Sequence, residues 1–401
     1  MQYPFTLASV WLFLAVISAI IGNHLRISVA LVEICLGVIA GTVAQHFWGI
    51  ERMGVNTEWL RFLASSGAVL LTFLAGAELE PLVIRTKMKE VSVIGVVGFL
   101  APFLGCAALA HFILGWSGPA SWLAGIALST TSMAVVYAVM LDTGLNRTDY
   151  GKGILGACFV NDLITVIALG LIFAPFTGRT FIFVADCATS VFLLPKLTRW
   201  LTKYYANRTA AVRAKWVLFV LFALGSAALW SGSEAVLPAY IAGMVLAGTA
   251  ARDNLWIRRM RTLTVGFLTP FYFIRAGAIV SVSDLLSAPL IFLALLGGKV
   301  SSKVFGLYPA IARFHQEKNE RWFYTLMMST GLTFGTISAL YGVTHGIISG
   351  EQYSFLVSVV IASAVVPTAI AGVRFVPKHL LPSKVQGIPA AITRQEEITD
   401  E

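Results

Sequence analysis

The chain has 401 residues, of which 57% are hydrophobic and 12% are charged, and its formal net charge is +9. Many stretches of about 20 residues carry one charge or none, which excludes an ordinary water-soluble globular protein and indicates a polytopic membrane protein. The four cysteines (Cys35, Cys106, Cys158 and Cys187) lie inside apolar runs, so neither a disulfide framework nor thiolate metal ligation is expected.

Hydropathy divides the chain into apolar segments that end at charged, proline and glycine clusters. The first segment has no basic residue before it and further spans follow directly, so we expect it to be a transmembrane helix rather than a cleaved signal peptide. The predicted fold class is an all-α polytopic membrane protein with about 13 transmembrane helices, near residues 5–22, 27–47, 58–78, 91–114, 119–141, 151–175, 178–195, 214–230, 234–250, 262–281, 285–311, 321–343 and 352–373. One membrane domain over residues 1–375 and a short cytoplasmic tail over 376–401 are expected, without an attached soluble domain.

The basic residues predict the orientation of the chain. If the N-terminus is outside, most of the 29 lysines and arginines lie in cytoplasmic segments, and the external segments carry only Arg52, Arg61 and Arg179. The positive-inside rule therefore predicts an external N-terminus and a cytoplasmic C-terminus. The same rule explains the net charge without a nucleic-acid partner, and anionic membrane lipid is the expected contact of the basic clusters.

An internal repeat relates the fifth and twelfth spans. Aligning residues 121–132 with 321–332 pairs Trp122 with Trp322, and the Ser-Thr dipeptide at Ser129 with the one at Ser329. Seven helices apart, the two stretches cross the membrane in opposite directions, which is typical of an inverted-topology repeat. A chance match between two apolar helices is the alternative.

Hydroxyl clusters occupy the same two spans. Ser129, Thr130, Thr131 and Ser132 are consecutive in the fifth span, and Ser329, Thr330 and Gly331 are their counterparts in the twelfth. Hydroxyl groups can satisfy the backbone of an interrupted helix, and the ends of half-helices present partial charges that attract ions. We therefore predict two crossing discontinuous helices that break at these residues. Ordinary hydrogen bonds from the hydroxyls to their own helices are the alternative reading.

Asp162 stands near the middle of an apolar run over residues 151–175, with Asn161 before it. An ionised Asp at the bilayer centre costs roughly 2.5 to 3.5 kcal/mol, so such residues usually line ion pathways or proton relays. A carboxylate can bind a small dehydrated cation or a proton, and competition between the two produces exchange. Asn161 can orient Asp162 or contact the ion. A structural partner that neutralises Asp162 is the alternative.

Lys299 and Lys303 lie one helical turn apart in the eleventh span. Lys299 is at a depth similar to that of Asp162, so we expect it to act as the coupling or charge partner, whereas Lys303 is expected to snorkel toward the cytoplasm. Glu78 is expected at the cytoplasmic end of the third span. The roles of the other intramembrane charges, Glu33, Asp186 and Arg275, stay open between structural pairing and transport, and the six histidines show no metal-ligand spacing.

The chain resembles the monovalent cation:proton antiporter superfamily, in particular the thirteen-helix bacterial branch with Kef-type and sodium/proton exchangers. The resemblance runs from about Ala30 to Pro367. It rests on the apolar, glycine-containing segments 31–41, 71–78, 239–248 and 270–277, and on the hydroxyl cluster at 129–132 followed by the Asn161-Asp162 pair.

This resemblance implies a homodimer in which a scaffold domain lies beside a moving core, the latter including residues 91–175 and 285–373. It also implies that Asp162 binds the monovalent cation or the proton, that Asn161 supports it, and that Thr131 borders the site together with Thr130 and Ser132. Lys299 matches the basic residue of the eleventh span, with Lys303 as the alternative one turn away. The Asn-Asp pair is similar to electroneutral relatives, although those often carry Arg where this chain has Lys299.

The predicted function is therefore antiport of one monovalent cation, Na+ or K+ with Li+ as a further alternative, against H+ by alternating access in the inner (plasma) membrane, without a bound cofactor and without enzymatic activity. Sodium-coupled transport of an organic solute is the nearest alternative. An uncoupled channel is a third reading. An intramembrane aspartyl hydrolase would need paired carboxylates, and no second mid-membrane Asp partners Asp162.

Overall fold

The computed structural model describes residues 4–25, 28–47, 49–77, 87–145, 148–173, 178–205, 211–231, 235–250 and 254–381. All regular structure in these ranges is helical, as the sequence predicts. In chain order the elements are α1 (Pro4–Leu25), α2 (Val29–Phe47), η1 (Ile50–Met53), α3 (Glu58–Ala77), α5 (Met88–Ala108), η2 (Leu109–Ile113), α6 (Gly118–Ser129), α7 (Met133–Thr143), α8 (Asp149–Phe173), α9 (Gly178–Tyr205), α10 (Val212–Trp230), α11 (Val236–Ala250), α12 (Asn254–Leu263), η4 (Thr264–Leu268), α13 (Thr269–Ala278), α14 (Val282–Ser287), α15 (Pro289–Ile311), α16 (Lys318–Met328), α17 (Thr333–Thr344), α18 (Gly350–Arg374) and η5 (Lys378–Leu380).

The described parts of the predicted spans are largely helical, and the fifth and twelfth spans are interrupted at residues 130–132 and 329–332. Within the described ranges, nine helical segments are long and apolar enough to cross a bilayer, and one of them, Lys318–Thr344, includes the interruption between α16 and α17. Backbone groups inside lipid must be paired within the segment, which explains why uninterrupted helices dominate. The count of thirteen spans stays a prediction, as does the division into a membrane domain and a tail, because residues 382–401 lie outside the described ranges.

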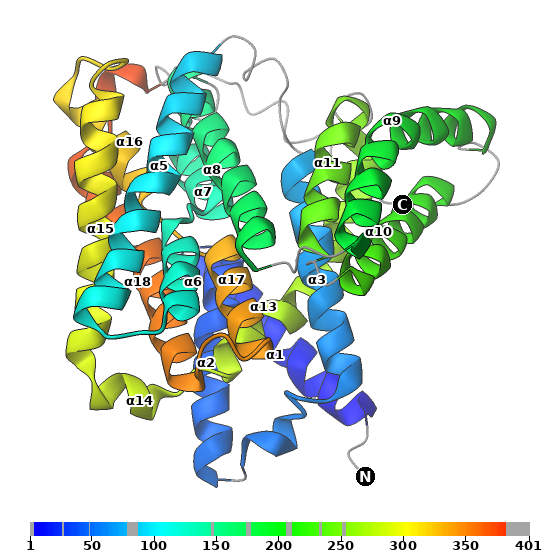
Figure 1. The fold of residues 1–401 in the computed structure, drawn as a ribbon, viewed down its shortest axis with the longest axis horizontal. Helices are drawn as coiled ribbons and strands as arrows, with labels where there is room; N and C mark the ends of the chain where they lie inside the picture. The colour runs from blue at the N-terminus through cyan, green and yellow to red at the C-terminus, as the bar shows by residue number, and fades with distance from the viewer. Residues whose placement is uncertain are drawn as a thin grey trace, which may run out of the picture.

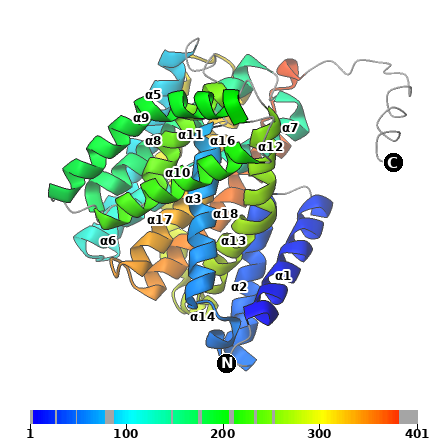
Figure 2. The same cartoon turned by 90° about the vertical axis from the view of Figure 1, so that its right-hand side faces the viewer.

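The helices gather in two groups. Figure 1 shows α5 to α8 together with α14 to α18 on one side of the molecule, and α3 with α9 to α11 on the other. Figure 2 shows α9 and α10 running diagonally across α3, with α1 and α2 farther along the same face. In the first group α15 and α8 both pack on α5, so that α5 stands between them.

Glycines allow a close approach between α2 and α13, which lie between the two groups. An added Cβ at Gly277 on α13 would collide with the backbone carbonyl of Ile34 on α2, and one at Gly37 would collide with the carbonyl of Ile274. Without water to drive association, helices in lipid are held by such close packing between small residues. These contacts make α2 and α13 a tightly joined pair beside the broken helices.

Two interruptions distinguish the first group of helices. The chain is non-helical between α6 and α7 and again between α16 and α17, at the two hydroxyl clusters. The boundaries fall at corresponding positions of the repeat, since α6 ends at Ser129 and α16 ends one residue before Ser329. The prediction of two discontinuous helices is therefore confirmed, and their breaks position the candidate site.

Candidate functional site

The two helix breaks meet inside the first group of helices. The Thr131 hydroxyl donates to the Met328 carbonyl at 2.9 Å, and the Ser132 backbone N–H donates to the Thr330 hydroxyl at 3.2 Å. Two hydrogen bonds therefore join the first break to the end of α16 and to the second break. Both bonds are donated by the first break, and they satisfy the Ser132 N–H and the Met328 carbonyl, which the interrupted helices leave open.

The remaining hydroxyls complete the helix ends locally. Ser129 and Thr130 donate to the Ile126 and Ala127 carbonyls of α6, at 2.8 and 3.0 Å. The Ser132 hydroxyl accepts from the Val135 backbone N–H at 3.4 Å, which caps the start of α7. The alternative reading, hydrogen bonds to their own helices, thus holds for some hydroxyls, while Thr131 bonds across the crossing.

Asp162 lies on α8 beside this crossing and is 2% exposed. Its Oδ1 atom is buried and has no hydrogen-bond partner among the described residues. Asn161 reaches the first break, because its Nδ2 donates to the Ser129 carbonyl at 3.4 Å, while its own Oδ1 atom is also buried without a partner in the described part. The carboxylate oxygen of Asp162 and the amide oxygen of Asn161 are therefore two acceptors at the crossing without a partner among the described residues. The carboxylate can bind a small cation or a proton, and the amide oxygen can bind a cation.

The two lysines of α15 are both fully buried, and they contact different helix breaks. Lys303 donates to the Thr131 hydroxyl at 3.1 Å and interacts electrostatically with the Asp162 carboxylate. It does not snorkel to the surface, contrary to the sequence-based expectation, because Thr131 offers its ammonium a buried acceptor. Lys303 therefore contacts the first helix break, and its charge acts on Asp162, whereas the sequence suggested Lys299 as the charge partner.

Lys299 is directed at the second break. Its Nζ atom is buried without a hydrogen-bond partner among the described residues, and it lies where a Cβ on Gly331 would be. The hydroxyls of Thr130 and Ser363 are close to the same point. Gly331 therefore leaves the space that the Lys299 ammonium occupies. The contribution of Ser363 was missed in the sequence because α18 showed no polar cluster there.

The other charged candidates lie apart from this crossing or outside the description. Arg275 donates through Nε to the Val55 carbonyl at 2.9 Å, and Glu33 is 3% exposed with no hydrogen bond or ion pair to another described residue. Glu78 lies outside the described residues, and the placement of the Asp186 side chain is not described. Structural pairing of Glu33, one of the two roles that the sequence left open, is not found among the described residues.

Comparison with known proteins shows the family of this chain. The family described as sodium/hydrogen exchanger, transmembrane, matches residues 12–373. The chain belongs to this family. A probable Na(+)/H(+) antiporter 3 from Methanocaldococcus jannaschii is 23% identical over 361 residues, which cover 86% of this chain and 90% of that protein. A Na(+)/H(+) antiporter from Enterococcus hirae is 23% identical over 389 residues, covering 90% and 96% of the two chains.

A solved structure shows the same fold. The sodium proton antiporter MjNhaP1 from Methanocaldococcus jannaschii, solved at pH 8, superimposes with a TM-score of 0.70 over 91% of this chain and 96% of that chain. The two sequences are 15% identical. The superfamily that the sequence resembles and its fold class are therefore confirmed.

Proposed function

We propose that this chain is a secondary antiporter that exchanges a monovalent cation, Na+ or K+ with Li+ as a further alternative, for H+ by alternating access. The observation that carries the proposal is the Asp162 carboxyl, buried beside two crossing helix breaks with one oxygen unpaired among the described residues. A carboxylate in such surroundings needs a cation or a proton to neutralise it. The family and the printed names of the relatives support the same activity.

The roles of the site residues follow from their contacts. Asp162 holds the cation or the proton, and the free Oδ1 of Asn161 is a second ligand for the cation. Thr131 links the two breaks and orients Lys303, while Lys299 stands at the second break beside Gly331. Ser329 and Thr330 end α16 by bonding to the Thr325 and Met327 carbonyls.

A single carboxylate at the site supports an electroneutral exchange. Asp162 is the one acidic side chain placed at the crossing among the described residues, so one cation and one proton occupy the same group in turn. The proposal further includes a homodimer in the inner membrane, with the N-terminus outside, the C-terminus in the cytoplasm, and anionic lipids at the basic cytoplasmic segments. It includes no bound cofactor and no enzymatic activity.

Purified protein in liposomes with an internal pH-sensitive dye tests this proposal. After a pH gradient is imposed, addition of Na+, K+ or Li+ is expected to collapse it, while choline and the Asp162→Asn variant give no response, because the amide cannot exchange a proton. A potential set by an ionophore should leave the rate of an electroneutral exchange unchanged. Cation-dependent proton flux retained by folded Asp162→Asn, or no response of the wild type to any alkali cation, would contradict the proposal.

A further inference from the structure

Tyr240 is a fully buried side chain that reaches from the second group of helices to the first. It lies on α11, and its hydroxyl donates to the Phe159 carbonyl of α8 at 3.2 Å. This carbonyl precedes Asn161 by two residues and Asp162 by three. Tyr240 therefore bonds to α8 within one helical turn of the candidate site.

The helix α11 lies along one face of α8, and Asp162 borders that face. An added Cβ at Gly170 of α8 would contact the Leu237 side chain of α11, and Gly170 is about three turns after Phe159. Residues three apart are neighbours on a helix surface, so Asp162 is next to Phe159. The charge of the Asp162 carboxylate also acts on the Tyr240 hydroxyl. The carboxyl thus lies between the helix crossing and Tyr240.

Two aromatic side chains of the first group hold the ring of Tyr240. Phe159 stacks on it with the ring centroids 5.4 Å apart, and Phe334 on α17 meets it edge to face at 5.9 Å. Phe334 precedes Gly335, where an added Cβ would contact the Thr130 hydroxyl of the first break. All three rings are buried. We call Phe159, Tyr240 and Phe334 the aromatic cover, because they separate the crossing from the second group of helices.

The backbone of Tyr240 is fixed to the second group. An added Cβ at Gly76 on α3 would collide with the Tyr240 carbonyl, and one at Gly243 on α11 would collide with the Phe73 carbonyl of α3. Close packing of this kind between small residues holds helices together in lipid. Tyr240 therefore belongs to the pair α3 and α11, whereas its partners in the aromatic cover belong to the helices around the site.

We propose that Tyr240 is a positioning residue for exchange, whose hydroxyl bond to the Phe159 carbonyl holds the aromatic cover closed over Asp162. This proposal rests on the antiport function proposed above. A cation reaches the buried carboxylate only after this bond breaks and the rings separate. Tyr240 does not ligate the cation, and it acts through α8, the helix that carries Asp162.

The direction of the effect follows from the fraction of the protein in which the cover is open. When a ligand binds only a minor form, its apparent affinity is reduced by the fraction of that form. One hydrogen bond between neutral groups changes such an equilibrium by a factor of about 2 to 10. Tyr240→Phe keeps the ring but removes the donor, so the open fraction and the apparent affinity for the cation should both increase.

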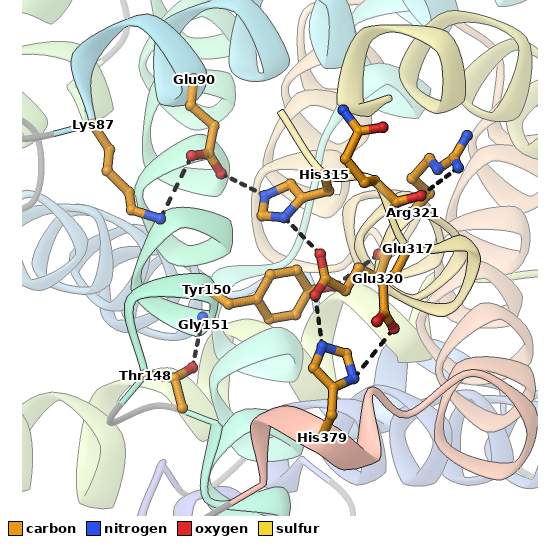
Figure 3. A network of polar contacts seen from close by, with 11 residues as sticks. Lys87, Glu90, Thr148, Tyr150, Gly151, His315, Glu317, Glu320, Arg321 and His379 are labelled. Atoms are coloured by element: carbon orange, nitrogen blue, oxygen red, sulfur yellow. Dashed lines mark hydrogen bonds and ion pairs between the residues drawn. The ribbon is translucent and has the colours of Figure 1, made fainter. Parts of the chain in front are cut away.

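The test compares Tyr240→Phe with the wild type in liposomes at one pH, with initial exchange rates measured over a range of Na+, K+ or Li+ concentrations. Tyr150→Phe is the matched control. Tyr150 is a buried tyrosine on α8, and its hydroxyl donates to the Glu320 backbone carbonyl of α16 at 2.7 Å (Figure 3). That bond joins two helices of the first group, so it does not have to break when the two groups separate.

Tyr240→Phe is expected to lower the KM for every transported cation by a similar factor, about 2- to 10-fold, while Tyr150→Phe keeps the wild-type KM. A role in folding alone would lower the melting temperature in detergent without this change in KM. A wild-type KM in folded Tyr240→Phe would overturn the proposal. A change in KM for one transported cation but not for another would also overturn it, because the hydroxyl would then be a ligand of the ion.

Chemical labelling of Asp162 separates this proposal from the antiport function. A hydrophobic carbodiimide reacts with protonated carboxyl groups that it can reach, and mass spectrometry of peptides that contain Asp162 measures the rate. If no cation drives proton flux in the wild type, the antiport function fails, but access to Asp162 can still be measured. Labelling should be faster in Tyr240→Phe than in the wild type and Tyr150→Phe, and equal rates in the three proteins would contradict the closed cover.

A second variant keeps the proposal testable if Tyr240→Phe does not fold. Phe334→Leu removes the ring that meets Tyr240 from α17, so the cover should open more often and Asp162 should be labelled faster than in the wild type. A wild-type labelling rate in folded Phe334→Leu would overturn the proposal in that case.

Discussion

At the scale of single residues, the account depends on how buried charges are neutralised. Asp162 is 2% exposed, and Lys299 and Lys303 are fully buried, yet only Lys303 has a hydrogen-bond partner among the described residues, namely Thr131. An ionised group left unpaired in a protein interior costs several kcal/mol. Such a cost is tolerated where an ion or a proton arrives and leaves, which is the role proposed for Asp162.

Substitution of Gly331 tests whether the Lys299 ammonium lies beside this glycine. Replacing Gly331 by Ala places a methyl group on the Lys299 ammonium, and such overpacking is expected to cost about 1 to 3 kcal/mol. We expect a lower melting temperature in detergent and a reduced exchange rate. Gly297→Ala is the control, because nothing lies within 4 Å of an added Cβ at that position of α15.

The double variant Gly331→Ala with Lys299→Ala sharpens this prediction. Shortening Lys299 removes the group that the new methyl meets, so the two effects should not add. Additive losses in melting temperature, or a Gly331→Ala protein as stable and active as Gly297→Ala, would show that Lys299 does not occupy this space.

At the scale of elements, the site is built around the crossing of the two broken helices, which α8 and α15 contact through Asn161 and Lys303. Its bonds join α6 and α7 to α16 and α17, and α15 lies against both through its lysines. The Tyr240 hydroxyl on α11 also donates to the Phe159 carbonyl of α8 at 3.2 Å, which connects the second group of helices to the helix that carries Asp162. Displacement of any of these elements changes the surroundings of Asp162.

Substitution of Thr131 tests whether its hydrogen bonds stabilise the crossing. Thr131→Val keeps the shape of the side chain but removes the hydroxyl that donates to Met328 and accepts from Lys303, at an expected cost of about 1 to 3 kcal/mol. Thermal unfolding in detergent should show a larger loss than in the matched variant Thr336→Val, whose buried hydroxyl bonds only to the Leu332 carbonyl of the same helix end. Equal losses in the two variants would contradict the bridging role of Thr131.

The sequence was sufficient to locate these elements but not their partners. Four consecutive hydroxyl residues at Ser129–Ser132 and their repeat at Ser329 predict the two breaks. Hydroxyl groups can bond to the backbone groups that an interrupted helix leaves unpaired. Which hydroxyl bonds across the crossing depends on contacts between residues nearly two hundred positions apart, which local patterns do not encode. For the same reason the sequence did not assign Lys303 to Thr131 or Tyr240 to the Phe159 carbonyl.

At the scale of the whole molecule, the fold provides one group of helices around the site and a second group beside it, which meets α8 through α11, while α2 and α13 lie between the groups (Figure 1). Family membership and the likeness to MjNhaP1 confirm this fold and the superfamily. The central claim is that a cation and a proton compete for one carboxylate, Asp162, inside this arrangement.

Proton release on cation binding tests that claim most directly. Na+ or K+ is added to the purified protein in a weakly buffered solution with a pH indicator, beside Asp162→Asn. The account predicts that a bound cation displaces a proton from the wild type, that apparent cation affinity falls as the pH is lowered, and that the variant releases none. Saturable cation binding with an affinity independent of pH, or proton release that persists in Asp162→Asn, would contradict it.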